Sequence, residues 1–283
     1  TMTKRERFLA FANFERVDRV PRHASYTPDL YQRMTAYLGE DPYAYFDNDG
    51  GGGAGLTPPA DYVAPDYRVY HEEWLDNPQF SIDGNGCGHL GHGFYHFTEY
   101  ISPLRHATRV EEIARYPIAS NAGWSDADMR QAAEDAHAAG NYATIFVGHM
   151  YENAWQVRGY EEFLMDLLTQ REWAELLLDR FCDNNLRTAE AAARAGYDCI
   201  MTGDDVANQS ALMFTPALWR EVMKPRWAKV IAAARAIKPD IHVWYHSDGN
   251  IESILDDLIE IGITILNPVQ PECMDPVAVR QRC

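Results

Sequence analysis

The sequence predicts an α/β fold of the (β/α)8 TIM-barrel type, in which parallel strands alternate with covering helices. From about residue 125 onward, short apolar runs suited to buried strands alternate with helical segments. Each crossover between parallel strands needs such a helix. No Gly-rich phosphate turn follows the first strand candidate, as a doubly wound sheet would require. The barrel is therefore the better of the two parallel architectures.

Four apolar runs are the clearest strand candidates in this part of the chain. They are ATIFVG (143–148), YDCIMT (197–202), IHVWY (241–245) and ITIL (263–266). With weaker candidates included, we count about five or six strands before the last residue, whereas a closed barrel of this type has eight. We therefore expect a barrel that lacks its last strands at the C-terminus, or a sheet that is open there.

Helix signals separate these strand candidates. Residues that favour helix N-termini precede three expected helices: Ser125, Thr215 and Asn250. Gly140 and Gly262 stand where two of these helices should end. Residues 160–195 place apolar side chains at helical spacing, and Pro225 should kink or restart the helix that contains it. Together, these signals supply a covering helix for each crossover.

We expect one domain over residues 1–283, with an irregular, loop-rich segment at about 41–106. This segment is rich in Gly, Pro, Asp, Tyr and His and has weak periodicity, so it should hold loops and short strands. Within it, the run CGHLGHGFYH carries Cys87, His89, His92 and His96. Its His and Cys density suggests a metal, but its spacing matches no zinc-ligand family. We interpret it as a Gly-rich loop that carries histidines.

Composition excludes several classes of partner. The chain has 42 acidic and 25 basic side chains and a formal charge of −17, whereas nucleic-acid binding needs clustered Lys and Arg. The same charge argues against an anionic membrane surface, and no apolar run approaches the roughly 18 residues of a membrane span. Five scattered cysteines without a CxxC favour a reducing compartment. We therefore expect a cytoplasmic protein without nucleic-acid or membrane partners.

Polar and titratable residues follow each of the four strand candidates directly. They are His149, Glu152 and Asn153, then Asp204, Asp205 and Gln209, then His246 and Asp248, and finally Asn267, Gln270 and Cys273. In barrels of this type, the chemistry lies just beyond the C-terminal ends of the strands. Single residues also have structural explanations, such as helix capping or turn formation. Four structural clusters in succession would be much less common, so the pattern predicts an active site.

His246 is the strongest candidate for a catalytic or metal-binding residue in these clusters. An imidazole carries protons near neutral pH or binds a metal, and Asp248 could orient it or share that metal. Cys273 on the next loop could complete a site for zinc. The spacing alone does not decide between proton transfer and a metal site at His246, Asp248 and Cys273.

Three segments resemble the uroporphyrinogen decarboxylase superfamily. They are TKRERFLAFANFERVDRVP, GDDVANQSALMFTPALWREVMKPRW and YHSDGNIESILDDLIEIGITILNPVQPECMDP, in the right order and spanning nearly the whole chain. The superfamily fold is a (β/α)8 barrel, which agrees with the alternation. Its members continue with a Gly-Gly-Ile-Asp-type segment, whereas this sequence stops at Cys283. The resemblance therefore implies a member that lacks its last strands and any ligand they carry.

Two branches of the superfamily compete. True decarboxylases carry an Arg-rich loop after the first strand, but here residues 22–26 read RHASY with one arginine. Because an unpaired buried carboxylate is costly, a chain of this charge is a poor receptor for a substrate with eight carboxylates. Metal-dependent methyltransferases of the corrinoid branch resemble His-x-Cys at the fifth strand, where this chain has His246-Ser247-Asp248. The segment 151–167, with Trp155 and Arg158, looks more like the methyltransferase branch.

The resemblance implies an enzyme, most simply a methyltransferase that exchanges a methyl group between a corrinoid and a small molecule. The corrinoid (cobalamin) is a co-substrate carried on a corrinoid-binding partner protein, and zinc is the metal that the branch suggests. We assign catalysis to His246, Asp204, Glu152 and Asp205. Substrate-binding candidates are His149, Asn153, Gln209, Asn267, Gln270 and Asp49, the last as a counterpart of the decarboxylase aspartate.

Two alternatives remain open at this point. The first is a uroporphyrinogen decarboxylase of porphyrin biosynthesis, a lyase that needs no metal and uses general acids. The second is a non-catalytic barrel that binds a tetrapyrrole. The sequence also leaves a homodimer open.

Overall fold

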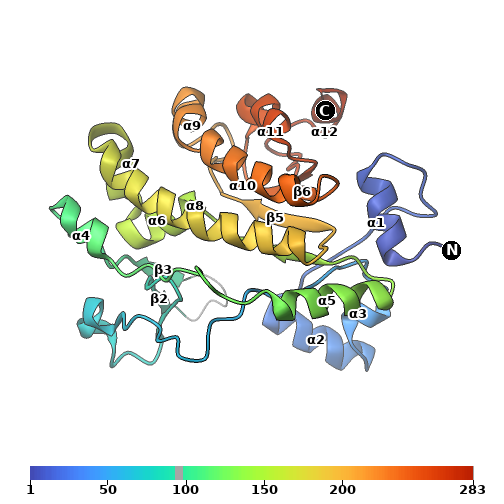
Figure 1. Ribbon diagram of the computed structural model, residues 1–283, viewed down its shortest axis with the longest axis horizontal. Coiled ribbons are helices and arrows are strands. Elements are labelled where there is room, and N and C mark those ends of the chain that lie inside the picture. Colours follow the sequence, from blue (N-terminus) through green and yellow to red (C-terminus); the bar gives the residue numbers. More distant parts are fainter. Residues whose placement is uncertain (93–97, 283) are drawn as a thin grey trace.

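The computed structural model describes residues 1–92 and 98–282. Its main sheet has four parallel strands in the order β4-β5-β6-β7 (Figure 1). They are β4 (Thr144–Phe146), β5 (Cys199–Gly203), β6 (His242–His246) and β7 (Ile265–Asn267). The sheet agrees with the four predicted runs, and a parallel bridge from Gly52 to Ala143 extends it beyond β4. The α/β barrel-type fold is therefore confirmed, with fewer than eight parallel strands among the described residues.

Helices cover the crossovers, as the alternation predicts. After the loop-rich segment they are α4 (Val110–Arg115), α5 (Ala127–Ala138), α6 (Tyr151–Arg158), α7 (Tyr160–Thr169), α8 (Arg171–Arg194), α9 (Pro216–Val222), α10 (Lys224–Ile237), α11 (Leu255–Ile261) and α12 (Pro276–Arg282). Before it lie α1 (Lys4–Ala12) and α2 (Pro28–Leu38). The long α8 and α10 pack side by side in front of the strands (Figure 1).

Local sequence explains where these helices begin and end. The Thr215 hydroxyl accepts a hydrogen bond from the Leu218 amide at 3.2 Å and caps α9, whose first residue is Pro216. Helix α10 restarts just before Pro225, as expected. The Asn250 side chain accepts from the Glu252 amide at 3.1 Å, although the N-cap of the short 3-10 turn Glu252–Ile254 before α11 is Ile251.

The loop-rich segment holds short elements only. They are α3 (Pro42–Tyr45), the 3-10 turns Arg68–Tyr70 and Glu72–Trp74, and a separate antiparallel sheet of β1 (Phe80–Ile82), β2 (Gly88–Gly91) and β3 (Thr98–Ile101). This small sheet lies at the opposite end of the molecule from α1 (Figure 1). The single domain over residues 1–283 stays a prediction.

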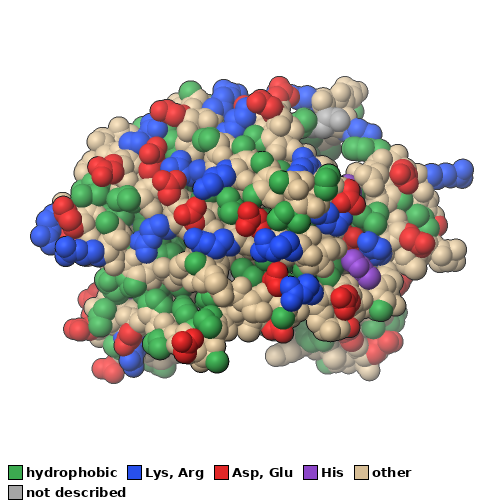
Figure 2. Space-filling view, in the orientation of Figure 1, with side chains coloured by type: hydrophobic (Ala, Val, Ile, Leu, Met, Phe, Trp, Pro, Cys, Tyr) green, Lys and Arg blue, Asp and Glu red, His purple; other side chains and the backbone are tan. Residues whose placement is uncertain are grey.

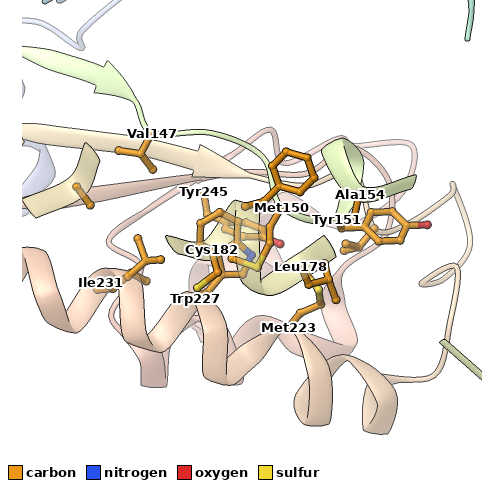
Figure 3. Packing of buried hydrophobic residues seen from close by; sticks show 14 of the residues in the cluster. Val147, Met150, Tyr151, Ala154, Leu178, Cys182, Met223, Trp227, Ile231 and Tyr245 are labelled. Atoms are coloured by element: carbon orange, nitrogen blue, oxygen red, sulfur yellow. The ribbon is translucent and has the colours of Figure 1, made fainter. Parts of the chain in front are cut away.

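The core lies between the parallel sheet and helices α6, α8 and α10. Trp227 of α10 meets Tyr245 of β6 with ring centroids 6.3 Å apart at 90°, and both side chains are fully buried. Cys182 of α8 and Met150 lie beside this pair (Figure 3). Burial of each such large apolar side chain contributes about 1.5–3 kcal/mol. This packing fixes the strands, and therefore the loops that follow them.

Acidic and basic side chains are intermixed over the visible face of the molecule (Figure 2). Many form pairs, such as Lys224 with Asp257 and Glu260. Among the described residues, no helix combines the length and apolarity that crossing a bilayer requires.

Candidate active site

Hydrogen bonds join the C-terminal ends of the parallel strands. The Asp204 amide after β5 donates to the His246 carbonyl at 3.0 Å, and the Ser247 amide after β6 donates to the Asn267 carbonyl at 3.0 Å. The β4 end joins through His149, whose Nδ1 lies 2.6 Å from the Gly203 carbonyl oxygen. All four strand-end clusters therefore meet at one edge of the sheet.

Asp204 is the central carboxyl of this edge and is fully buried. Its Oδ1 accepts hydrogen bonds from the amides of Met150 (2.8 Å) and Glu152 (3.1 Å), at the start of α6. Its Oδ2 is buried without a hydrogen-bond partner. Burial raises the pKa of Asp204 to about 7, with the negative charge of Glu152 adding to the rise and the positive charge of His149 opposing it. Near neutral pH, this carboxyl both holds and releases a proton.

His149 and Glu152 form an ion pair beside Asp204. His149 Nδ1 lies 2.9 Å from Glu152 Oε2, which also accepts from the Asp205 amide at 3.0 Å. Burial lowers the pKa of His149, but the Glu152 hydrogen bond and the charges of Asp204 and Glu152 outweigh burial and raise it to about 9. Burial raises the pKa of Glu152, yet its bond with His149 leaves that pKa below the usual value. At neutral pH, His149 therefore stays protonated and Glu152 ionised, and Asp204 is the group of this trio whose pKa lies near 7.

A second trio is built around His246. Its Nδ1 lies 2.8 Å from Asn267 Oδ1, which is an acceptor, so Nδ1 carries the proton. Its Nε2 then faces Asp205 Oδ1 at 3.6 Å and Asp248 Oδ1 at 3.9 Å. The Asp248 amide donates to Asp205 Oδ1 at 2.8 Å, which holds the two loops together.

The ligand atoms of Asp205, His246 and Asp248 all lie within 4.8 Å of one another. One nitrogen and two carboxylate oxygens form a donor set that suits a divalent cation such as zinc.

Cys273 lies outside this trio. Its Sγ is 3.5 Å from Gln270 Oε1, which also accepts from the Gly249 amide at 2.5 Å. The predicted trio of His246, Asp248 and Cys273 thus differs from the observed one by a single residue, because Asp205 stands where sulfur was expected. The metal itself stays a prediction.

The predicted substrate-binding residues differ in their position relative to this edge. Asn153 donates to the His149 carbonyl at 2.9 Å, and Asn267 and Gln270 hold the loops after β6. Gln209 is exposed on the loop after β5.

Asp49 lies in a separate, buried arginine cluster. It pairs with Arg7 at 2.6 Å and with Arg19, and it accepts from the Arg22 amide at 2.9 Å. Both of its oxygens are therefore occupied, which leaves no free oxygen for a substrate.

Two tyrosines near this edge, Tyr245 and Tyr100, were not predicted from the sequence, and Ser247 was named only as the residue between His246 and Asp248. The buried Ser247 hydroxyl lies 3.3 Å from the Val206 amide that donates to it. The buried Tyr245 hydroxyl has no hydrogen-bond partner, and burial, followed by the charge of Asp204, raises the pKa of Tyr245. Both flank His246 in sequence, which was a usable signal. The sequence held no such signal for Tyr100 of β3, because the position of Tyr100 depends on how the small antiparallel sheet packs.

The histidine-rich run forms a third trio. Asp83, Cys87 and His89 place ligand atoms within 4.8 Å of one another, with His89 Nε2 3.0 Å from Asp83 Oδ2. Asp83 Oδ1 already accepts from the Asn85 and Cys87 amides and shapes the turn before β2. His96 lies outside the described residues.

A barrel-type α/β fold with titratable residues at the C-terminal ends of its strands defines the class of TIM-barrel enzymes. The family model "Uroporphyrinogen decarboxylase (URO-D)" matches residues 146–274. This match agrees with the superfamily predicted from the sequence, and it spans every candidate site residue except Asp49.

Among solved structures, the chain is similar to a methyltransferase from Methanosarcina mazei. The TM-score is 0.53 at 18% sequence identity, covering 94% of this chain and 76% of that chain. At this identity, the likeness supports the fold alone. None of the curated proteins matches the sequence.

Proposed function

We propose that this protein is a methyltransferase that exchanges a methyl group between a corrinoid on a partner protein and a small molecule. The observation that carries the proposal is the Asp204 carboxyl, which is buried, has a free oxygen and has a pKa of about 7. A general acid works best when its pKa lies near the working pH. The similar solved structure is named a methyltransferase, which is the motive for choosing methyl transfer as the reaction.

Methyl transfer from oxygen or nitrogen leaves an electron pair on the departing atom, and that atom then takes up a proton. Asp204 holds such a proton on its Oδ2 side, and the adjacent His149–Glu152 pair holds the next one. The corrinoid, when bound, supplies the cobalt that exchanges the methyl group. This chain's residues orient the small molecule and manage its proton.

Asp205, His246 and Asp248 would hold a divalent cation, which would polarise the departing atom of the small molecule. Activation of a substrate thiol by a sulfur-rich zinc site fits poorly, because Cys273 lies outside the trio. Oxygen and nitrogen compounds are therefore the preferred methyl donors.

The test is methylation of free cob(I)alamin under anaerobic conditions, followed by the absorbance change as methylcobalamin forms. Methanol, methoxybenzene and choline serve as methyl donors of three classes. We expect turnover with at least one donor and its loss in His246→Ala. His106→Ala is the matched control, because His106 is an exposed histidine outside the site.

The runner-up functions give different results in the same preparation. Decarboxylation of uroporphyrinogen without methyl transfer would reject the proposal and indicate a uroporphyrinogen decarboxylase of porphyrin biosynthesis. Tight tetrapyrrole binding without either reaction would favour the non-catalytic barrel. The corrinoid-binding partner belongs to this proposal, whereas the homodimer and the cytoplasmic location stay predictions.

A further inference from the structure

A pocket of about 280 Å³ opens beside the strand-end edge, between β3 and the α6–α7 junction. This volume lies just below the range of about 300–1,000 Å³ that is typical for drug-sized ligands, so it suits a small head group. The aromatic and charged side chains that line it are Tyr100, Arg105, Trp155, Tyr160, Glu161 and Glu162.

Three aromatic rings form the walls of this pocket. Tyr100 lies 5.1 Å from Trp155 at 87° between ring planes, and Tyr160 lies 5.3 Å from Trp155 at 85°. Both tyrosines therefore stand almost perpendicular to the tryptophan on which they pack. Tyr100 is 40% exposed, so its ring is accessible to a ligand.

The charges around the pocket favour a cation. Two carboxylates, Glu161 and Glu162, and one guanidinium, Arg105, line the pocket. Arg105 Nε lies 3.7 Å from Glu162 Oε1, so its charge is partly compensated. Burial and then the negative charge of Glu152 raise the pKa of Tyr100, which shows that the pocket lies in the field of the strand-end carboxylates.

The pocket and the catalytic edge share helix α6. Trp155 follows Glu152 by three residues, so the two side chains lie on neighbouring positions of one helix face. The Trp155 wall of the pocket therefore lies within one helical turn of Glu152.

We propose that this pocket binds a small methylated ammonium cation, such as a trimethylammonium head group. Aromatic faces attract a desolvated cation, and aromatic cages recognise quaternary ammonium in this way. The assignment of this cation as the methyl donor rests on the proposed function. In that reaction, the carbon–nitrogen bond breaks, cobalt(I) forms the new bond to carbon, and the tertiary amine leaves with the electron pair. The amine then takes a proton from solvent water.

The binding test compares choline with 3,3-dimethylbutan-1-ol, its neutral isostere, by calorimetry on the whole chain without a corrinoid. A cation–π contribution of about 1–2 kcal/mol predicts that choline binds roughly 5- to 30-fold more tightly. Equal binding of the two, or preferential binding of benzoate to Arg105, would overturn the proposal.

Two variants locate the binding site. Trp155→Leu and Tyr100→Leu should each weaken choline binding by about fivefold or more. Trp124→Leu is the matched control, because Trp124 also packs edge-to-face on a tyrosine, Tyr62, but lies outside the pocket lining. Unchanged choline affinity in Tyr100→Leu, whose side chain is 40% exposed, would also overturn the proposal.

This inference and the proposed function fail separately. Choline binding without methyl transfer from any donor would support the pocket and reject the methyltransferase. Methyl transfer from methoxybenzene without choline binding would support the methyltransferase and reject the pocket.

Discussion

Strand β5 carries a buried aspartate just beyond each end, and the two have opposite surroundings. Asp198 precedes the strand and Asp204 follows it, with exposures of 1% and 0%. Asp198 accepts from Arg5 Nη2 at 2.9 Å, from His137 Nε2 at 2.8 Å and from the Ala143 amide at 2.9 Å. Burial raises the pKa of Asp198, but these partners outweigh burial and hold it below the usual value.

Asp204 has neutral partners on one oxygen and none on the other. Its pKa is therefore raised to about 7, mainly by burial. At the N-terminal edge of the sheet, the buried carboxylate of Asp198 stabilises the fold through its ion pairs. At the C-terminal edge, the carboxyl of Asp204 is costly to ionise. This division is the one expected of TIM-barrel enzymes.

The largest expected effect is on catalysis at the C-terminal edge. Asp204→Asn keeps an oxygen for the Met150 and Glu152 amides but removes the exchangeable proton. We expect the rate of methylcobalamin formation to fall by about 10²–10⁴-fold, the usual contribution of a general acid or base. Asp198→Asn should leave the rate per folded molecule unchanged. An equal loss in both variants would erase the functional difference between the two ends.

The next effect is on stability at the N-terminal edge. Asp198→Asn removes charged hydrogen bonds to Arg5 and His137 and should lower the free energy of unfolding by about 2–3 kcal/mol in urea titrations at pH 7. Because the folded pKa of Asp198 is depressed, its stabilisation is present above the unfolded value of 3.8 and is lost as the pH falls through the folded pKa. A variant as stable as the parent at pH 7 would contradict this reading.

Asp204 should have the opposite effect on stability. Its folded pKa of about 7 lies above the unfolded value of 3.8, so its contribution is fully present below pH 3.8 and is lost as the pH rises towards 7. Asp204→Asn should remove this pH dependence and raise stability at pH 8 by roughly 1–2 kcal/mol. Urea midpoints at pH 5 and pH 8 measure the change. A destabilised variant at pH 8 would show that the ionised carboxyl is better compensated than its contacts indicate.

The same strand shows how much the sequence could predict. The apolar run at 197–202 located β5, and the barrel rule then marked Asp204 and Asp205 as site candidates. The sequence could not predict the opposite environments of Asp198 and Asp204. The partners Arg5 and His137 lie 193 and 61 residues from Asp198 along the chain. The sequence could not predict the arginine partners of Asp49 for the same reason, since Arg7 is 42 residues away. Periodicity locates elements, whereas partners of buried charges depend on the tertiary fold.

The smallest expected effect concerns the cation trio at the C-terminal edge. Cys273 contacts Gln270 and lies outside the group formed by Asp205, His246 and Asp248. Cys273→Ser should therefore leave bound zinc, measured by elemental analysis after zinc loading, and turnover within about twofold, a change below roughly 0.5 kcal/mol. Asp205→Asn should reduce the bound zinc in the same assay. If Cys273→Ser loses the metal and Asp205→Asn keeps it, the loops rearrange around sulfur, and the C-terminal edge uses a different ligand set from the one its geometry indicates.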